Sequence, residues 1–302
     1  MTAKALTEDR LVAALTRRWR ASAALPVGPG DDCAVIVAGK ERLFFKTDAV
    51  VEGLHFTART PAALVGRKAL ARVLSDAAAM GGRPTHALVT LALPPKFSSH
   101  HVARIAGIYR GIEALARRHG VTLAGGETTR SPKLLLSIAL VGTLPPRPLL
   151  RSGGKAGDDL WVTGTLGATL RGGNGAKHLA FTPRLAEGGW LARRTYATAA
   201  MDLSDGLAAD LPRLARMSRC GFRVDREALP LSLGATIRSA LSDGEDYELL
   251  FAAPSAIRAR LAREWKKTFP RVRLTRIGGL VRRGAGEDPA ALGHGYDHVR
   301  KA

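Results

Sequence analysis

The pattern of apolar residues predicts an α+β fold, with an α/β arrangement as the alternative, divided into two domains. Short β-branched runs alternate with longer amphipathic stretches, which are typical of strands and helices. The 302 residues are 46% apolar, enough to form a core in each of about two domains. Pro145, Pro146 and Pro148 give the clearest boundary signal. We therefore expect domains at residues 1–147 and 148–302.

The first half is expected to contain five strands and two helices. The strands are flanked by Gly, Pro or charged residues and lie at residues 33–37, 43–48, 86–93, 121–124 and 134–143. Thr60 and Pro61 open the first helix as N-cap and first helical residue, and Gly81 closes it. The second helix runs from Ser98 to Gly120, because glycine is common just past a helix end.

The second half is expected to contain four strands and two helices. The strands lie at residues 160–163, 199–202, 222–225 and 246–253. A glycine-rich loop at residues 164–175 follows the first of them. The second strand is expected to lead through Ser204 into a helix that ends near Gly221, and the last helix covers residues 254 to about 269.

Composition excludes several classes of protein. The net charge of +20 suggests a nucleic acid partner, but the basic residues are scattered and aromatic residues are only 5%, so we expect a solvated basic surface and no nucleic acid. Cys33 and Cys220 are the two cysteines, which favours a reducing cytoplasm over a disulfide scaffold. The longest apolar run, residues 134–146, is too short to span a membrane. The N-terminus lacks the apolar core of a signal peptide.

The acidic residues are more informative than the basic ones. Many lie beside glycine at predicted strand or helix ends: Asp31, Asp32, Asp48, Asp76, Glu127, Asp202, Asp205, Glu245 and Asp246. Clustered carboxylates in loops are typical ligands of Mg²⁺, together with water and substrate phosphate. No P-loop, Rossmann or protein-kinase motif is present. If the protein handles ATP, metal ions and scattered loops must therefore hold it.

Each of these carboxylates also has a structural interpretation. Asp76 lies near the C-terminal end of its helix, where the helix dipole disfavours a negative charge; either a cation offsets this, or Asp76 caps a loop amide or pairs with Arg72. Asp202 and Asp205 could converge at a strand-to-helix junction beside free amides that bind phosphate. Alternatively, Ser204 or Asp205 is only the helix N-cap. Asp31 and Asp32 could form a simple Asx-type turn.

Nine segments match a known family in its own order along the chain. They lie at residues 28–33, 47–56, 74–81, 125–130, 151–158, 162–164, 201–207, 244–249 and 295–298. Among them are Gly-Gly-Glu-Thr-Thr, Met-Asp-Leu-Ser-Asp-Gly and Gly-Glu-Asp-Tyr-Glu. Together they resemble the thiamine-monophosphate kinase family of the PurM-like superfamily, which includes aminoimidazole ribonucleotide synthetase.

The resemblance implies a two-domain PurM-like architecture, with an N-terminal α/β domain whose sheet forms a dimer and a C-terminal α+β domain. It implies transfer of the γ-phosphoryl group of ATP to thiamine monophosphate, assisted by several Mg²⁺ ions. The positions matching metal-binding residues are Asp32, Thr47, Asp48, Asp76, Glu127, Asp202 and Asp205. Those matching ATP contacts are Gly126, Glu127, Arg151, Ser204 and Tyr109. His55, Glu245 and Tyr296 match contacts to thiamine monophosphate. The acceptor is already a phosphate oxyanion, so no general base is expected.

The chain departs from the family pattern at two positions. Glu127 replaces the usual Asp, and its longer side chain could still reach an ion. Lys46 stands where the family usually has a small hydroxyl residue. Its side chain could point away along the strand, or it could place an ammonium group where a metal ion would otherwise sit. We expect a weakened metal site in an active enzyme. The segment at residues 167–183 is glycine-rich and shortened, so no ATP contacts are carried over there.

Two other functions stay open. Another PurM-like ATP-dependent enzyme is one, although aminoimidazole ribonucleotide synthetase lacks support from the motifs at residues 202–207 and Glu245. The other is a non-catalytic polyanion-binding relative, in which Lys46 and Glu127 would mark lost activity. Steeply salt-dependent DNA binding without ATP turnover would favour this second function.

Overall fold

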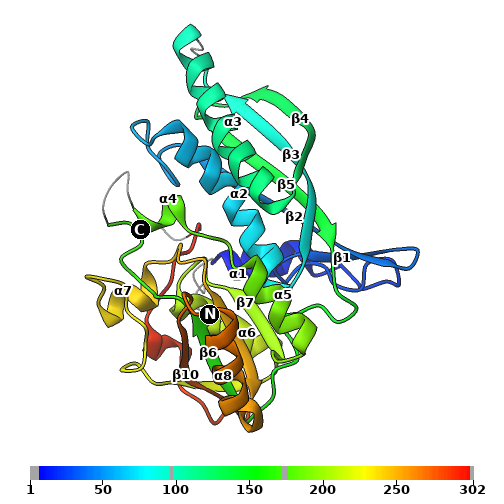
Figure 1. Ribbon diagram of the computed structural model, residues 1–302, viewed down its shortest axis with the longest axis vertical. Coiled ribbons are helices and arrows are strands. Elements are labelled where there is room, and N and C mark those ends of the chain that lie inside the picture. The colour runs from blue at the N-terminus through cyan, green and yellow to red at the C-terminus, as the bar shows by residue number, and fades with distance from the viewer. Residues whose placement is uncertain (1–6, 96–97, 172–175, 300–302) are drawn as a thin grey trace, which may run out of the picture.

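The computed structural model describes residues 7–95, 98–171 and 176–299. Two five-stranded sheets organise the chain, with strand orders β1-β2-β5-β3-β4 and β7-β9-β6-β10-β8. The first sheet and the helices on it form the upper part of Figure 1, and the second sheet forms the lower part. The predicted boundary at residue 147 falls in the segment that joins the two sheets. The α+β class predicted from the sequence is confirmed.

The first sheet is mostly antiparallel, and only β3 and β4 run parallel. Its strands are β1 (Ala34–Ala38), β2 (Glu41–Val51), β3 (Arg83–Leu93), β4 (Thr122–Arg130) and β5 (Leu135–Thr143). Two helices, α2 (Ala62–Ala79) and α3 (Ser99–His119), cover one face. Helix α3 has the predicted ends, with N-cap Ser98 and left-handed Gly120 after it. Helix α2 begins one residue later than predicted, with Pro61 at its N-cap.

The second sheet is antiparallel throughout. Its strands are β6 (Asp158–Thr163), β7 (Ala199–Asp202), β8 (Gly221–Val224), β9 (Leu249–Pro254) and β10 (Leu274–Val281). A core of aliphatic residues joins one face to α6 (Leu207–Met217) and α7 (Ile237–Ser242). A second core, rich in aromatic side chains, joins the other face to α5 (Leu185–Arg194) and α8 (Arg258–Thr268).

The structure corrects two predicted elements beside the acidic motifs. The helix expected to run from Ser204 begins at Leu207, because Gly206 adopts a φ of 96° that breaks the path from β7. The strand expected from residue 246 begins at Leu249. Glu245 and Tyr247 have positive φ values of 53° and 52°, which a β-strand does not accommodate. Both acidic motifs therefore lie in loops.

Some elements were not predicted at all: α4 (Lys177–Ala180), α5, α7 and β10. Helix α5 contains Gly188 and Gly189, which are unfavourable inside a helix. A Cβ atom on Gly188 would lie 1.9 Å from the carbonyl oxygen of Ala78 on α2. Glycine at this position therefore lets α5 pack closely against α2, at the junction of the two halves.

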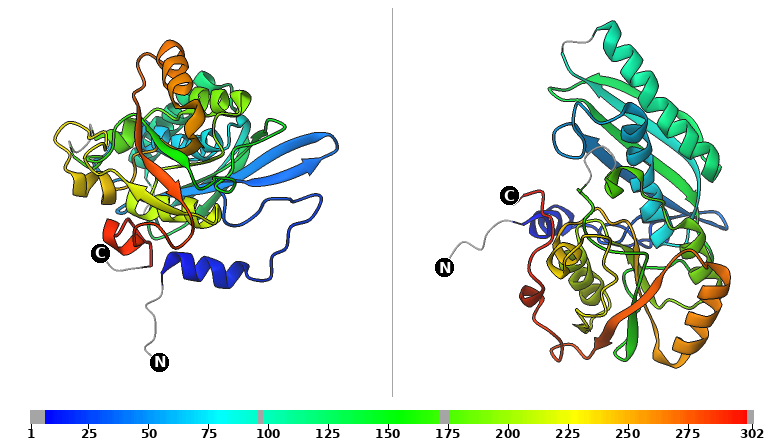
Figure 2. Two further views of the ribbon diagram at one scale, coloured as in Figure 1. Left: turned by 90° about the horizontal axis from the view of Figure 1, so that it is seen from below. Right: turned by 60° about the vertical axis from the view of Figure 1, so that its left-hand side comes forward.

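The N-terminal helix α1 (Glu8–Thr16) lies beside the C-terminal segment, as both views of Figure 2 show. The backbone N–H of Glu8 donates to the carboxylate of Asp297 at 3.2 Å, and Asp9 pairs with Arg213 and Arg216. Among the described residues, no helix has the length and apolar character needed to cross a membrane.

Candidate metal and phosphate site

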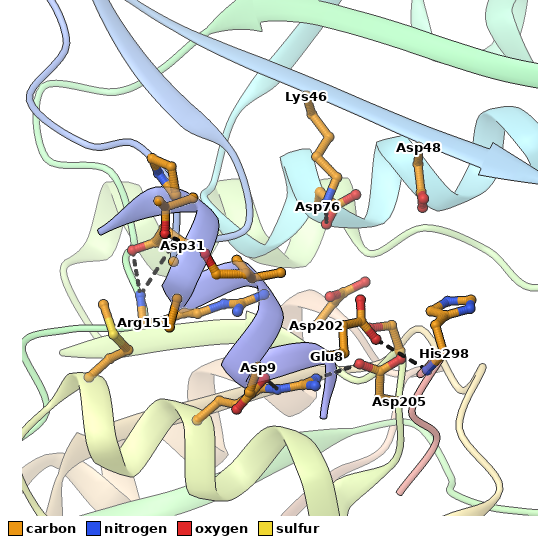
Figure 3. A pocket seen from close by; sticks show the side chains of 18 of the residues that line it. Glu8, Asp9, Asp31, Lys46, Asp48, Asp76, Arg151, Asp202, Asp205 and His298 are labelled. Atoms are coloured by element: carbon orange, nitrogen blue, oxygen red, sulfur yellow. Dashed lines mark hydrogen bonds and ion pairs between the residues drawn. The ribbon is translucent and has the colours of Figure 1, made fainter. Parts of the chain in front are cut away.

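Three buried carboxylates from distant parts of the sequence meet between the two sheets. Asp32 precedes β1, Asp76 lies in the last turn of α2, and Asp202 ends β7. One oxygen atom from each carboxylate lies within 4.8 Å of the others, and we call this set the aspartate cluster. Asp76 and Asp202 line a cavity of about 510 Å³, together with Asp48, Ser204, Asp205 and Arg151. Figure 3 shows Asp48, Asp76, Asp202, Asp205 and Arg151 around this cavity.

The local structure explains how Asp32 is held in the cluster. The carboxylate of Asp31 accepts the backbone N–H of Asp32 at 3.0 Å and that of Arg151 at 3.2 Å. Asp31 thus accepts from the residue directly after it and from Arg151. The Asx-type turn considered from the sequence, in which the side chain accepts from the backbone two residues on, is not among these contacts. Asp31 ties the loop before β1 to Arg151, and Asp32 is the residue of the pair that belongs to the cluster.

Crowding of the carboxylates perturbs their protonation. Burial, with the nearby charge of Asp32, raises the pKa of Asp202 to about 6 and that of Asp31 to about 7. Burial also raises the pKa of Asp76 well above its usual value, although the ammonium of Lys46 opposes the shift. The cluster therefore holds more negative charge than it can keep ionised without added cations.

Basic side chains pair with most of the predicted carboxylates. Lys46 Nζ lies 2.8 Å from Asp76 Oδ1, so Asp76 does not pair with Arg72 as one interpretation held. Burial alone would lower the pKa of Lys46, but Asp76 and Asp48 outweigh it and raise the pKa. Arg72 instead pairs with Asp48 at 3.0 Å. Arg151 donates to Asp32 Oδ1 from Nε at 3.1 Å.

Asp205 is not one of the three carboxylates of the aspartate cluster, although Asp202 and Asp205 line the same cavity. Its carboxylate pairs with Arg213, which also binds Asp210 at 2.9 Å. Neither Ser204 nor Asp205 is the N-cap of α6, because Gly206 takes that position. Ser204 and Asp205 nevertheless line the large cavity.

The aspartate cluster has the properties of a divalent-cation site. Asp32 Oδ2 is buried and has no hydrogen-bond partner among the described residues. Asp202 Oδ2 accepts a hydrogen bond from Ser75 Oγ at 2.6 Å, which fixes that carboxylate in place. Hard oxygen donors from three elements, one of them buried and unpartnered, fit a cation such as Mg²⁺.

Four predicted residues lie away from the large cavity in the described chain. Thr47 lies on the face of β2 opposite Lys46, and its hydroxyl is 3.1 Å from Ser137 Oγ. Gly126 and Glu127 are exposed on β4, the strand at the sheet edge. Tyr109 lies on α3 and packs against the core between the first sheet and its helices.

The three residues predicted to contact thiamine monophosphate do converge. His55, Glu245 and Tyr296 line a smaller cavity of about 100 Å³ together with Arg72 and Tyr247. This cavity adjoins the large one, because Arg72 and Tyr247 line both. Aromatic and charged side chains thus surround a compact space next to the aspartate cluster.

A buried lysine that the sequence reasoning missed holds Glu245 in this smaller cavity. Lys68 on α2 is fully buried; its Nζ donates to the carbonyl oxygen of His55 at 2.8 Å and lies 2.7 Å from Glu245 Oε1. His178 Nδ1 lies 2.8 Å from Glu245 Oε2. A basic residue on the apolar face of α2, four residues before Arg72, was the available signal.

The charges of this group depend on each other. Burial lowers the pKa of Lys68 to about 8 in spite of Glu245. Burial alone would raise the pKa of Glu245, but His178 and Lys68 outweigh it and lower the pKa to about 2. Burial, with Arg72 and Lys68 nearby, lowers the pKa of His55 to about 4. At neutral pH, Glu245 is therefore an anion and His55 is neutral.

Comparisons with known proteins identify the class and then the family. Residues 30–144 match the family described as AIR synthase related protein, N-terminal domain. Thiamine-monophosphate kinase of Rhodopirellula baltica is 37% identical over 298 residues, covering 91% of this chain and 90% of that protein. The Salmonella typhimurium enzyme is 38% identical over 282 residues, covering 84% and 85%. This chain belongs to the thiamine-monophosphate kinase family.

A solved structure gives the same result. The structure of AaThiL complexed with AMPPCP and TMP matches with a TM-score of 0.79 and 29% identity, and the match covers 99% of this chain and 100% of that chain.

Proposed function

We propose that this chain transfers the γ-phosphoryl group of ATP to the phosphate of thiamine monophosphate, which yields ADP and thiamine diphosphate. Membership of the thiamine-monophosphate kinase family supports this reaction, as does the likeness to AaThiL complexed with AMPPCP and TMP. The observation that carries the proposal is the aspartate cluster beside the cavity of His55, Glu245 and Tyr296. A phosphate-binding centre and an organic-substrate pocket therefore adjoin.

Several Mg²⁺ ions are part of this proposal. Asp32, Asp76 and Asp202 are the residues that would hold them, with Asp48 and Asp205 at the border of the same cavity. When bound, Mg²⁺ neutralises and bridges the phosphate oxygens of donor and acceptor, which removes the repulsion between two anions.

The chain's own basic groups would position the phosphates. Lys46, Arg72, Arg151 and Arg213 line the large cavity from four different elements. Arginine binds phosphate oxygens in a bidentate manner, and lysine binds them as a point charge. The carboxylate of Glu245, which is ionised at neutral pH, would hold thiamine monophosphate by attracting the cationic thiazolium ring of that substrate. No residue needs to remove a proton, since the attacking oxygen is already anionic.

A homodimer formed through the first sheet is also proposed. Strand β4 pairs only with β3 and lies at the sheet edge, and most of its residues are exposed. Phe45 and Leu88 are large apolar side chains with 47% exposure. Pairing of two sheets would bury such side chains, and it would bring Gly126 and Glu127 near an interface. A cytoplasmic location is proposed from the two free cysteines, Cys33 and Cys220.

The reaction can be tested directly. We would incubate the purified chain with ATP, MgCl₂ and thiamine monophosphate, and measure thiamine diphosphate and ADP by liquid chromatography and mass spectrometry. Equal amounts of both products are expected, and none without Mg²⁺. Asp202→Asn is expected to lower the rate at least about a hundredfold, while Asp225→Asn, an exposed matched control, retains it. ADP without thiamine diphosphate, or an active Asp202→Asn, would contradict the proposal.

A further inference from the structure

Lys46 has an unusual position, because it brings a positive charge into a cluster of carboxylates. Side chains alternate along β2, so that buried Phe44, Lys46, Asp48 and buried Val50 share the face toward α2. Lys46 Nζ contacts Asp76 Oδ1 at 2.8 Å. Figure 3 shows Lys46 reaching from β2 toward Asp76, with Asp48 beside it. Of the two directions left open by the sequence, the structure has the inward one.

The contact places an ammonium group on one of the three carboxylates that would otherwise serve a divalent cation. A lysine ammonium is a compact point charge with three donors, and it remains protonated at neutral pH in contact with a carboxylate. Asp76 is 8% exposed at its side chain, and Lys46 is 25% exposed. The pair is therefore largely shielded from solvent. In such surroundings the charge of the ammonium acts strongly on neighbouring groups.

The rest of the cluster stays available. Asp32 uses Oδ1 for Arg151, and its buried Oδ2 has no partner among the described residues. Asp202 Oδ2 accepts a hydrogen bond from the hydroxyl of Ser75. An ammonium thus contacts the cluster at Asp76, while the unpartnered carboxylate oxygen belongs to Asp32.

We propose that Lys46 supplies, as a fixed part of the chain, the positive charge that a divalent cation would otherwise supply at Asp76, so that this site binds one divalent cation fewer. The inference rests on the proposed function of the aspartate cluster as the metal and phosphate centre. Lys46 would then face the phosphates of ATP from the cavity that it lines. The remaining cations would bind at Asp32 and Asp202 and at the border of the same cavity.

The test counts bound Mn²⁺ by electron paramagnetic resonance, with Mn²⁺ alone and with Mn²⁺ plus AMPPCP. Lys46→Ser removes the charge, and Lys46→Arg keeps it. Lys40→Ser is the matched control, because Lys40 is exposed in the turn before the same strand. Lys46→Ser is expected to bind one more Mn²⁺ per chain than the wild-type chain. Its affinity for Mn²⁺ is expected to be roughly tenfold higher or more, because a unit charge within a few ångströms is removed from a partly buried site. Lys46→Arg and Lys40→Ser are expected to match the wild-type chain.

An unchanged count and affinity in Lys46→Ser, relative to Lys40→Ser, would overturn the inference. If thermal melting shows that Lys46→Ser is unfolded, Lys46→Thr carries the same expectation, because a β-branched residue suits β2. Formation of thiamine diphosphate by the wild-type chain is measured in the same samples. A chain without kinase activity that still gains one Mn²⁺ in Lys46→Ser overturns the proposed function alone. An active chain with an unchanged Mn²⁺ count overturns the Lys46 inference alone.

Discussion

Replacement of Lys68 by Met is expected to lower the free energy of unfolding by about 3–5 kcal/mol, the range for removing one partner of a buried ion pair. Lys68 is fully buried, and its ammonium contacts Glu245, His178 and the carbonyl oxygen of His55 at 2.7–2.8 Å. Without it, Glu245 keeps His178 as a hydrogen-bond partner but loses its lysine partner, and the carbonyl oxygen of His55 loses this donor. The Met side chain fills nearly the same volume, so the charge is the main change.

The same substitution should displace Glu245 in the smaller cavity. We therefore expect the KM for thiamine monophosphate to rise about tenfold or more, and the KM for ATP to change much less. Urea unfolding followed by circular dichroism gives the stability, and steady-state assays give both constants. In Lys68→Met combined with Glu245→Gln, about 2–3 kcal/mol of the lost stability should return, because no charge is left unpaired.

Lys133→Met is the control, since Lys133 is exposed in the turn between β4 and β5. A loss below about 1 kcal/mol in Lys68→Met, or a KM for thiamine monophosphate equal to that of Lys133→Met, would refute the positioning role of Lys68.

Two further predictions concern packing and pH. Gly188→Ala should lower the free energy of unfolding by about 1–3 kcal/mol through overpacking against Ala78. Gly189→Ala is the control and should not lower it, because a Cβ there meets only the flexible side chain of Arg193. Equal urea midpoints for the two variants would show that α5 does not need the close contact with α2. The folded-state pKa of His55, about 4, lies below its unfolded value, so the unfolded chain binds the proton first and stability falls as the pH drops from about 6.5 toward 4. The measurement is the drop in urea midpoint between pH 7 and pH 5, which should be smaller for His55→Asn than for the exposed control His86→Asn. Equal drops in the two variants would show that His55 does not cause the loss of stability.

Local signals in the sequence were sufficient for much of the fold. Ser98 and Gly120 mark the ends of α3, because capping depends on the residues at the helix end itself. The ends of α6 and β9 were wrong, because positive φ values at Gly206, Glu245 and Tyr247 depend on tertiary contacts. Helix α5 was missed because Gly188 serves a contact with Ala78 of α2, which lies over 100 residues away in the sequence.

The carboxylates of the aspartate cluster could be predicted from the sequence, but most of the contacts around the predicted carboxylates could not. Asp32, Asp76 and Asp202 were each suspected from their position at the end of a predicted strand or helix, and the structure brings them together. The basic partners of other predicted carboxylates were harder to predict. Lys68 and Glu245 are 177 residues apart, and Asp205 meets Arg213 through the loop before α6. The direction of Lys46 follows from strand alternation with Phe44 and Asp48, which makes it the contact most accessible to sequence reasoning.

The most direct measurement is a crystal structure of the wild-type chain with AMPPCP, thiamine monophosphate and Mn²⁺, collected for anomalous scattering. The account predicts a manganese peak within about 2.5 Å of carboxylate oxygens of Asp32 and Asp202, with the nucleotide phosphates on one side and the phosphate of thiamine monophosphate on the other. Lys46 should remain on Asp76. Manganese peaks that avoid these aspartates, with both ligands bound elsewhere, would contradict the assignment of the aspartate cluster as the centre of phosphoryl transfer.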